Sequence, residues 1–504
     1  MEKVRVRFAP SPTGPLHMGG VRTALFNYLF ARKHKGSMIL RIEDTDQNRY
    51  VQGAEEYVME SLSWCGIELD EGVREGGDYA PYRQSERSSI YREYANRLIE
   101  SGWAYYAFDT PEQLQKLREE AENKKETFTY NHTVRNQLDN SLNIGMEAAR
   151  KRIEQGDHYV VRFKMPENED IRMQDIIRGD LSFQAANLDD KVLFKSDGLP
   201  TYHLANIVDD HLMEISHVIR GEEWLPSLPL HFMLYKALGW KTPEFAHLPL
   251  ILKPTGKGKL SKRDGDKLGF PVFPIEWKPE NGEPARGYRE DGYYPEAFVN
   301  MLALLGWNPG TEQELFSMEE LIEQFDLGKV NKAGARFDPE KAKWFNHQYL
   351  IRKSDDDIAR EFAPILESRG YRMEMDKLSH LVGLVKERVS FVHELWEQVD
   401  FIFEAPSGYN KKFRKKAVKN DTPEILRNVR KLLAEQTDFT SKSMEDAVKA
   451  WIESQELGFG KVMNPLRLAL VGEGKGPHVF DILEILGKEE SLQRLDALLE
   501  DIEE

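Results

Sequence analysis

A turn rich in proline and glycine, at residues 9–20, carries a single histidine, His17. It follows an alternating run at residues 4–8 that predicts a strand, and it precedes a run with helical spacing. Such a junction presents free backbone N–H groups and the positive end of a helix, and its small residues let a phosphate come close. His17 could therefore direct its imidazole at phosphate oxygens. The alternative is a turn with an incidental histidine, and Gly20 stands where a P-loop would have its lysine.

A second candidate phosphate site is the glycine-flanked loop at residues 256–265. Its cations are point charges suited to a triphosphate, and its glycines allow movement. Taken alone, the loop could equally be a solvated basic segment. It follows the first turn in the order expected when two halves of one nucleotide-binding sheet flank an insertion. The residues of interest are Lys259, Leu260, Ser261, Lys262 and Arg263.

Two arginines at predicted strand ends could bind carboxylates. Arg7 ends the first strand, and Arg220 ends a later one at residues 217–220. Arginine binds a carboxylate through two parallel hydrogen bonds, and Glu43 is a plausible partner for an ammonium group. The alternatives are salt-bridged cations and a strand-end cap.

A metal site is a further alternative for part of this region. It would use Asp209, Asp210 and His211 together with His203. We do not favour it, because adjacent acids on one helix point in different directions.

The elements around these residues predict an α/β protein with a helical end. Strands at residues 4–8 and 38–42 flank a helix, which is typical of a parallel, right-handed β-α-β unit. From about residue 103 a charged helix and short strands indicate an inserted α+β module. Residues 266–292, rich in proline, predict a surface insertion or hairpin, and after residue 349 the composition is helical.

Composition limits the class of protein. The chain has 504 residues, enough for three or four domains, and 40% hydrophobic residues, which excludes global disorder. Its one cysteine, Cys65, can form neither a disulfide framework nor a cysteine-based zinc site. We find no secretory signal and no apolar run of bilayer length, so we expect a cytoplasmic protein without membrane association. A net charge of −16 argues against a nucleic-acid partner, because phosphates bind lysine and arginine. An acidic protein can still have a basic face that binds nucleic acid.

Residues 10–20 resemble the "HIGH" element of class I aminoacyl-tRNA synthetases, in the form used by the glutamyl and glutaminyl enzymes. Gly20 takes the place of the final histidine, as expected in this subfamily. Residues 259–263 resemble the "KMSKS" loop, with leucine and arginine as departures. Blocks at residues 41–46, 82–85, 195–198 and 201–206 continue the similarity to bacterial-type glutamyl-tRNA synthetases over about the first 350 residues.

The resemblance implies a multidomain α/β fold. A Rossmann-like catalytic domain (1–104 and 196–255) would contain an inserted acceptor-end-binding module (105–195). A KMSKS-loop and stem-contact region (256–350, including 266–292) and an all-α anticodon-binding region (351–504) would follow. The implied reaction is ATP-dependent glutamylation of tRNA(Glu) by a monomer, with Mg²⁺ accompanying ATP. No zinc is expected, because Ala107 and Asp109 stand where some relatives have cysteines.

The resemblance also implies roles for individual residues. His17 and Lys262 would be catalytic. Arg388 would read the anticodon. ATP would contact Pro10, Thr13, Gly14, His17, Gly19, Gly20, Lys259, Leu260, Ser261, Lys262 and Arg263, and glutamate would contact Arg7, Ala9, Ser11, Glu43, Tyr202, Asn206 and Arg220.

Three alternatives within this group stay open. A glutaminyl-tRNA synthetase would bind an amino acid with an amide in place of the side-chain carboxylate. Typical glutaminyl enzymes, however, have β-barrels in the C-terminal region, where this sequence predicts helices. A truncated relative that glutamylates a modified tRNA base would lack the long helical end. A non-catalytic RNA-binding paralogue would be expected to have lost His17 or Lys262, and both are present.

Overall fold

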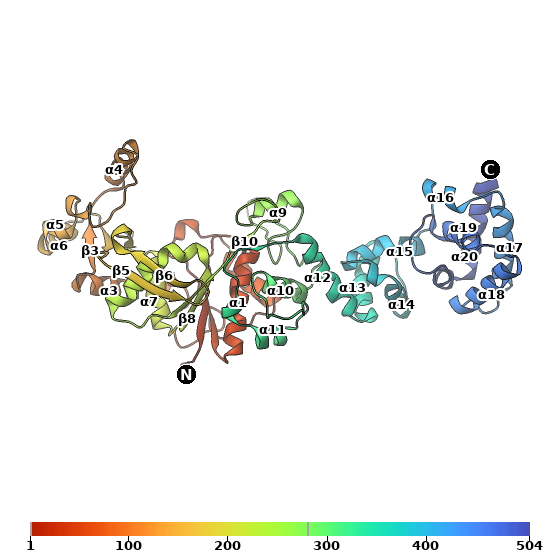
Figure 1. Ribbon diagram of the computed structural model, residues 1–504, viewed down its shortest axis with the longest axis horizontal. Coiled ribbons are helices and arrows are strands. Elements are labelled where there is room, and N and C mark those ends of the chain that lie inside the picture. The colour runs from red at the N-terminus through yellow and green to blue at the C-terminus, as the bar shows by residue number, and fades with distance from the viewer. Residues whose placement is uncertain (1–2, 280–281, 504) are drawn as a thin grey trace. The chain divides into compact units, whose positions relative to one another are not determined.

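The computed structural model describes residues 3–279 and 282–503, which form two compact units. The first comprises the chain up to Asp291 together with Pro295–Pro339, and the second comprises Gly292–Tyr294 and the chain from Glu340 onward (Figure 1). In the described part of the chain, no helix is both long and apolar enough to cross a membrane.

Every strand of the described residues belongs to the first unit. Its first half has, in order, β1 (Arg5–Phe8), α1 (Met18–Lys33), β2 (Ser37–Leu40), α2 (Ala54–Trp64), α3 (Ser88–Glu100), β3 (Ala104–Ala107), α4 (Pro111–Asn123), α5 (Ser141–Ile144), α6 (Met146–Glu154), β4 (Val160–Phe163), β5 (Asp170–Asp175) and β6 (Gly179–Gln184). Its second half has β7 (Val192–Phe194), α7 (Tyr202–Leu212), β8 (His217–Gly221), α8 (Leu228–Leu238), β9 (Glu244–Leu248), β10 (Ile251–Leu252), α9 (Lys262–Leu268), α10 (Pro295–Leu304), α11 (Met318–Gln324) and β11 (Ala335–Arg336).

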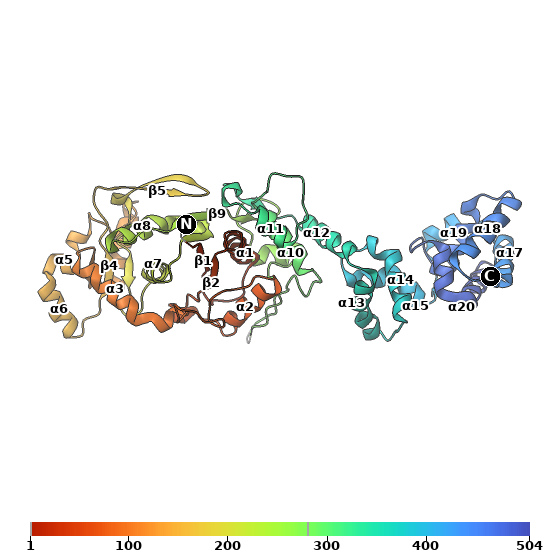
Figure 2. The same ribbon diagram turned by 90° about the horizontal axis from the view of Figure 1, so that it is seen from below.

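The predicted β-α-β unit is confirmed. β1 and β2 pair in parallel, with Arg5 opposite Ser37 and Phe8 opposite Leu40, and α1 lies beside both strands (Figure 2). β8 and β9 pair in parallel within a four-stranded sheet of order β6-β5-β9-β8. The two sheets meet where the backbone N–H of Ser216 donates to the carbonyl of Arg5 at 2.9 Å. Arg7 and Arg220 thus lie at the carboxyl ends of neighbouring strands.

The predicted inserted module holds a three-stranded antiparallel sheet of order β3-β4-β7. Within the same stretch, the β5–β6 hairpin joins the other sheet, because Asp175 of β5 pairs with Phe245 of β9 in parallel. Local sequence explains the module's first helix. Thr110 and Gln113 form a reciprocal capping box and Pro111 begins α4, which satisfies backbone donors that the helix cannot satisfy itself.

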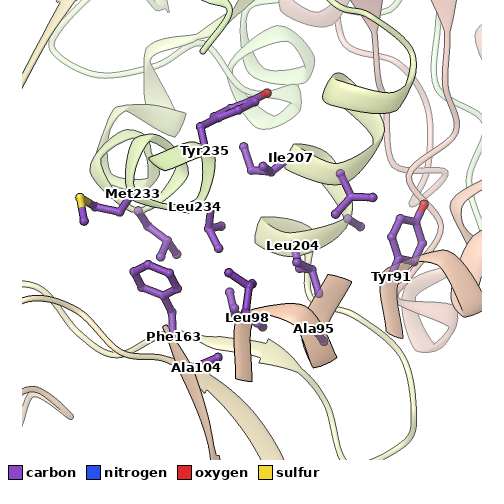
Figure 3. Packing of buried hydrophobic residues seen from close by; sticks show 14 of the residues in the cluster. Tyr91, Ala95, Leu98, Ala104, Phe163, Leu204, Ile207, Met233, Leu234 and Tyr235 are labelled. Atoms are coloured by element: carbon purple, nitrogen blue, oxygen red, sulfur yellow. The ribbon is translucent and has the colours of Figure 1, made fainter. Parts of the chain in front are cut away.

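A hydrophobic core joins this module to the four-stranded sheet of order β6-β5-β9-β8. Figure 3 shows Leu98 of α3, Leu204 of α7, Leu234 of α8 and Phe163 of β4 packed together. These side chains are fully buried. Burial of one such side chain stabilises the fold by roughly 1.5–3 kcal/mol, so this contact fixes α7 relative to the strands.

The sequence predicts a surface insertion or hairpin for residues 266–292, and the structure differs from a surface segment in part. A hairpin is present, because Trp277 and Ala285 form an antiparallel bridge, while residues 280–281 lie outside the described residues. Part of the segment, however, is buried in the first unit. Val272, Phe273 and Ile275 are buried. The backbone N–H of Met18, at the start of α1, donates to the carbonyl of Val272 at 2.8 Å.

Cys65 caps the C-terminus of α2 and is buried. Burial raises the pKa of its thiol well above the ordinary value, so the group stays protonated.

The second unit is helical, as predicted after residue 349. Its helices are α12 (Pro339–Arg352), α13 (Asp355–Ser368), α14 (Met375–Val385), α15 (Leu395–Phe403), α16 (Lys411–Ala417), α17 (Thr422–Glu435), α18 (Ser441–Ser454), α19 (Phe459–Val471) and α20 (Val479–Glu503). Two hydrophobic clusters lie within it. One is built mainly from α13, α14 and α15, and the other from α17 to α20.

Candidate active site

A cavity of about 470 Å³ opens at the carboxyl ends of β1 and β8. It brings together most of the residues predicted to bind glutamate or ATP. These are Arg7, Ala9, Pro10, Ser11, His17, Gly19, Gly20, Glu43, Tyr202, Asn206, Arg220, Lys259 and Leu260. Their elements are far apart in sequence, and the parallel strands bring them to one edge.

Arg220 is held by neutral groups. Its Nε donates to Nε2 of His247 at 3.0 Å, and its Nη1 donates to the hydroxyl of Tyr202 at 2.9 Å. Nη1 also lies 3.3 Å from Nδ1 of His231. Nη2 is buried and has no hydrogen-bond partner, and among residues 3–279 and 282–503 no carboxylate pairs with this guanidinium. The guanidinium of Arg220 is therefore a buried cation that pairs with no carboxylate of the described residues.

The histidines around Arg220 remain neutral. Burial lowers the pKa of His247 and, more strongly, that of His231, and the nearby Arg220 acts in the same direction on both. A neutral imidazole can accept a hydrogen bond through its unprotonated nitrogen. Neutral rings can therefore hold the arginine without cancelling its charge.

Arg7, in contrast, is neutralised by the protein. Asp210 accepts from its Nε at 3.0 Å and from its Nη2 at 3.2 Å. Asp210 also accepts from Arg41 at 2.8 Å. Burial opposes ionisation of Asp210, but the two arginines outweigh that effect and lower its pKa.

Glu43 lies on the same buried network. Its Oε1 accepts from Arg41 and from the amide of Asn206, each at 3.1 Å. Burial raises the pKa of Glu43, and Arg41 and Arg7 only partly offset this. A carboxylate with such a pKa gains from a further cation, such as a substrate ammonium group.

His17 is the N-cap of α1, and its Nδ1 accepts from the backbone N–H of Gly19 at 3.1 Å. Nε2, the other ring nitrogen, is buried without a hydrogen-bond partner and carries the proton. Burial, and to a smaller extent Lys259, lowers the pKa of His17 to about 4. His17 is therefore a neutral donor at neutral pH, fixed in one orientation.

Two lysines of the glycine-flanked loop at residues 256–265, hereafter the basic loop, line two different cavities. Nζ of Lys259 lies 2.9 Å from Oε1 of Glu223 in the first cavity. Lys262 lines a second cavity of about 660 Å³, which also contains His17, Thr13 and Gly14. Ser261 and Arg263 line neither cavity. Lys262 is the first residue of the short helix α9.

Comparison with known proteins decides the family. Residues 3–344 match the family described as tRNA synthetases class I (E and Q), catalytic domain. The chain belongs to this family. Residues 357–499 match an anticodon binding domain. The predicted fold class, a class I catalytic domain followed by a helical anticodon-binding region, is therefore confirmed.

Relatives of this class I synthetase match it along its whole length. The glutamate–tRNA ligase of Flavobacterium johnsoniae is 61% identical, over 99% of each chain. That of Phocaeicola vulgatus is 58% identical over the same shares. A crystal structure of a glutamate tRNA ligase from Elizabethkingia meningosepticum, in complex with its amino acid, has a TM-score of 0.97 at 53% identity, covering 99% of each chain.

In this synthetase the alternative metal residues have other partners. Asp209 accepts from Arg87 and from Tyr91, each at 2.8 Å, and Asp210 accepts from the two arginines described above. His211 stacks on Trp240 with ring centroids 3.8 Å apart. Across the described ranges, no group of three or more His, Cys, Asp or Glu residues could hold a metal ion.

Several residues of the cavity escaped the sequence analysis. Glu223 and Trp224 line it, and a signal existed, because they directly follow the strand that ends in Arg220. His231 and His247 had no signal, since single histidines in α8 and β9 carry no pattern.

Arg388 belongs to the second unit and lines neither cavity. Its Nη1 donates to the carbonyl of Gly476 at 2.7 Å, and Arg467 donates to the carbonyls of Lys475 and Pro477. Two arginines thus hold the turn between α19 and α20.

Proposed function

We propose that this synthetase is a glutamate–tRNA ligase. It would activate L-glutamate with ATP to glutamyl-adenylate, and then transfer the glutamyl group to the 3′ end of tRNA(Glu), releasing AMP and pyrophosphate. Whole-length relatives bearing the name glutamate–tRNA ligase support this proposal.

One observation carries the choice of glutamate over glutamine. Arg220 is buried, has an unpartnered Nη2, and is surrounded by neutral acceptors. A carboxylate would both neutralise this charge and satisfy the free donor, whereas an amide would leave the charge uncompensated. The predicted alternative, glutaminyl specificity, lacks such support.

The spacing on α7 supports the orientation of the amino acid. Tyr202 bonds Arg220, and Asn206, four residues later, bonds Glu43. Residues four apart on a helix lie roughly 6 Å apart, similar to the reach from the amino group of glutamate to its side-chain carboxylate. We therefore assign the ammonium group to Glu43 and the side-chain carboxylate to Arg220. Arg7, Ala9, Ser11, Tyr202 and Asn206 would complete the pocket.

The residues assigned to ATP surround the start of α1. His17 would donate from Nε2 to the phosphates, and Lys259 and Lys262 would supply positive charge as the glutamate carboxylate attacks the α-phosphate. Pro10, Thr13, Gly14, Gly19, Gly20 and Leu260 would shape the walls, with Ser261 and Arg263 outside them. Mg²⁺ would travel with the triphosphate, whose oxygens are its preferred ligands. We expect no zinc.

The proposed domains follow the order of the chain. We assign the catalytic domain to residues 1–104 and 196–255, the acceptor-end module to 105–195, the KMSKS-loop region to 256–350, and anticodon reading to 351–504, with Arg388 as one reader. We further propose a cytoplasmic monomer. Helices carry the anticodon region here, consistent with reading unstacked bases of an RNA loop.

ATP–pyrophosphate exchange with glutamate or glutamine, with and without bulk tRNA, tests the function. We expect exchange with glutamate that appears when tRNA is added. Preference for glutamine would overturn the proposal in favour of the glutaminyl relative. No exchange with either amino acid would favour the RNA-binding paralogue.

A further inference from the structure

Behind Arg220 lies a second, fully buried pair of residues. Oδ2 of Asp175 is 2.7 Å from Nδ1 of His247, and both side chains have 0% exposure. On the opposite edge of the ring, Nε2 of His247 accepts from Nε of Arg220 at 3.0 Å. The three residues form a chain of hydrogen bonds ending at the cavity.

The chemistry of Asp175 fixes the proton on His247. Its carboxylate already accepts from the backbone N–H groups of Ile177, Arg178 and His247, at 2.9, 2.8 and 3.1 Å. Although burial opposes ionisation, the bond from His247 and these backbone donors lower the pKa of Asp175. An ionised carboxylate only accepts, so the ring proton lies on Nδ1 and Nε2 presents its lone pair to Arg220.

Asp175 belongs to a different part of the chain from Arg220. It ends β5, within the stretch that we assign to the acceptor-end module, while His247 lies on β9. The turn after Asp175 also contacts residues that are next to the lining of the first cavity. Arg178 donates to the carbonyl of His247 at 3.1 Å and pairs with Glu222 at 2.7 Å, next to Glu223.

We propose that Asp175 and His247 are positioning residues that orient Arg220 for the side-chain carboxylate of glutamate. The proposal rests on the proposed function. It makes the β5–β6 turn part of the amino-acid site, although this turn lines neither cavity. Such outer partners fix the tautomer and direction of the group that touches the ligand.

Substitution of Asp175 by asparagine tests the tautomer directly. The Asp175→Asn side chain can still accept from the turn, but its NH₂ would face Nδ1 of His247. The ring proton would then move to Nε2, where it opposes the Nε–H of Arg220. We expect the KM for glutamate to rise by about tenfold or more, the scale of one unsatisfied buried donor, while the KM for ATP changes less than about twofold.

A second pair of variants keeps the test decisive if Asp175→Asn does not fold. His247→Gln retains an oxygen acceptor near the position of Nε2, whereas His247→Leu does not. We expect His247→Gln to keep a glutamate KM closer to that of the unaltered chain than His247→Leu. The matched control is Asp190→Asn, which alters a carboxylate of 0% exposure bound to Arg135 and Tyr105. It should leave the KM for glutamate unchanged.

The measurement is pyrophosphate exchange by the full chain at saturating tRNA, titrated with glutamate and separately with ATP. The inference alone is overturned if the unaltered chain activates glutamate and both Asp175→Asn and His247→Leu keep its KM. It is also overturned if both KM values rise together, in parallel with Asp190→Asn. An unaltered chain that fails to activate glutamate would overturn the proposed function instead, and this inference with it.

Discussion

Arg7 and Asp210 form a buried ion pair joined by two hydrogen bonds, Nε to Oδ1 at 3.0 Å and Nη2 to Oδ2 at 3.2 Å. Arg220 lies in the same cavity, but its bonds go to neutral groups. The two arginines are therefore not equivalent. Asp210 neutralises Arg7, whereas the guanidinium of Arg220 pairs with no carboxylate of residues 3–279 or 282–503.

Loss of Arg220 should abolish discrimination against glutamine. We expect Arg220→Gln to lower kcat/KM for glutamate by the equivalent of about 2–5 kcal/mol, because a desolvated carboxylate loses its partner. Activity with glutamine should fall far less. Steady-state exchange with each amino acid measures the ratio, and an unchanged preference for glutamate would contradict the assignment.

Lys262 and the neighbouring Lys257 offer a matched comparison. Lys262 lines the second cavity with His17, whereas Lys257 is exposed and lines neither cavity. Lys262→Ala should slow glutamate activation by about 100- to 1,000-fold, as expected for one charge on a phosphoryl transition state. Lys257→Ala should not change the rate. Intact exchange by Lys262→Ala would refute its catalytic role.

Stability should depend on pH through the buried histidines. Burial lowers the pKa of His17 and of His203 from 6.5 to about 4. Between these values the unfolded chain binds protons that the folded chain does not, so stability rises with pH from about 4 to 6.5 and falls on acidification. Thermal unfolding across this range measures the slope. His203→Gln should reduce this slope. A thermal midpoint that does not change with pH would contradict the lowered pKa values of the two histidines.

The segment at residues 270–279 should contribute to stability. The hydroxyl of Tyr57, on α2, donates to the backbone carbonyl of Ile275 inside the protein. Tyr57→Phe leaves that acceptor unsatisfied and should destabilise the first unit by about 1 kcal/mol. Tyr50→Phe alters an exposed ring (44% exposure) and serves as control. Equal thermal midpoints for the two variants would argue against a structural role for the contact.

Arg388 should affect tRNA and not the small substrates. We expect Arg388→Gln to raise the KM for tRNA by the equivalent of about 1–3 kcal/mol, the range for one base contact. The KM values for ATP and glutamate should stay constant at saturating tRNA. Lys442→Ala, which breaks a surface pair with Asp446, provides the control. An unchanged KM for tRNA would show that Arg388 does not read the anticodon.

Periodicity made much of the fold predictable. The alternation at residues 4–8 and the helical spacing after Gly20 correspond to β1 and α1. Arg7 and Arg220 line one cavity, as the rule that strand ends meet at one edge predicts. The packing of Val272 and Phe273 was missed, because proline-rich segments carry no period. Asp175 and His247 were invisible for another reason. They lie 72 residues apart, and only the sheet order brings them together.

The burial of Cys65 has a practical consequence. Its thiol is enclosed and stays protonated, so thiol-directed reagents should ignore it. Any cysteine introduced at the surface would then be the single reactive one, without removal of a native residue. A fluorophore attached through Lys257→Cys would therefore report optically, and in real time, on the basic loop as nucleotide is added.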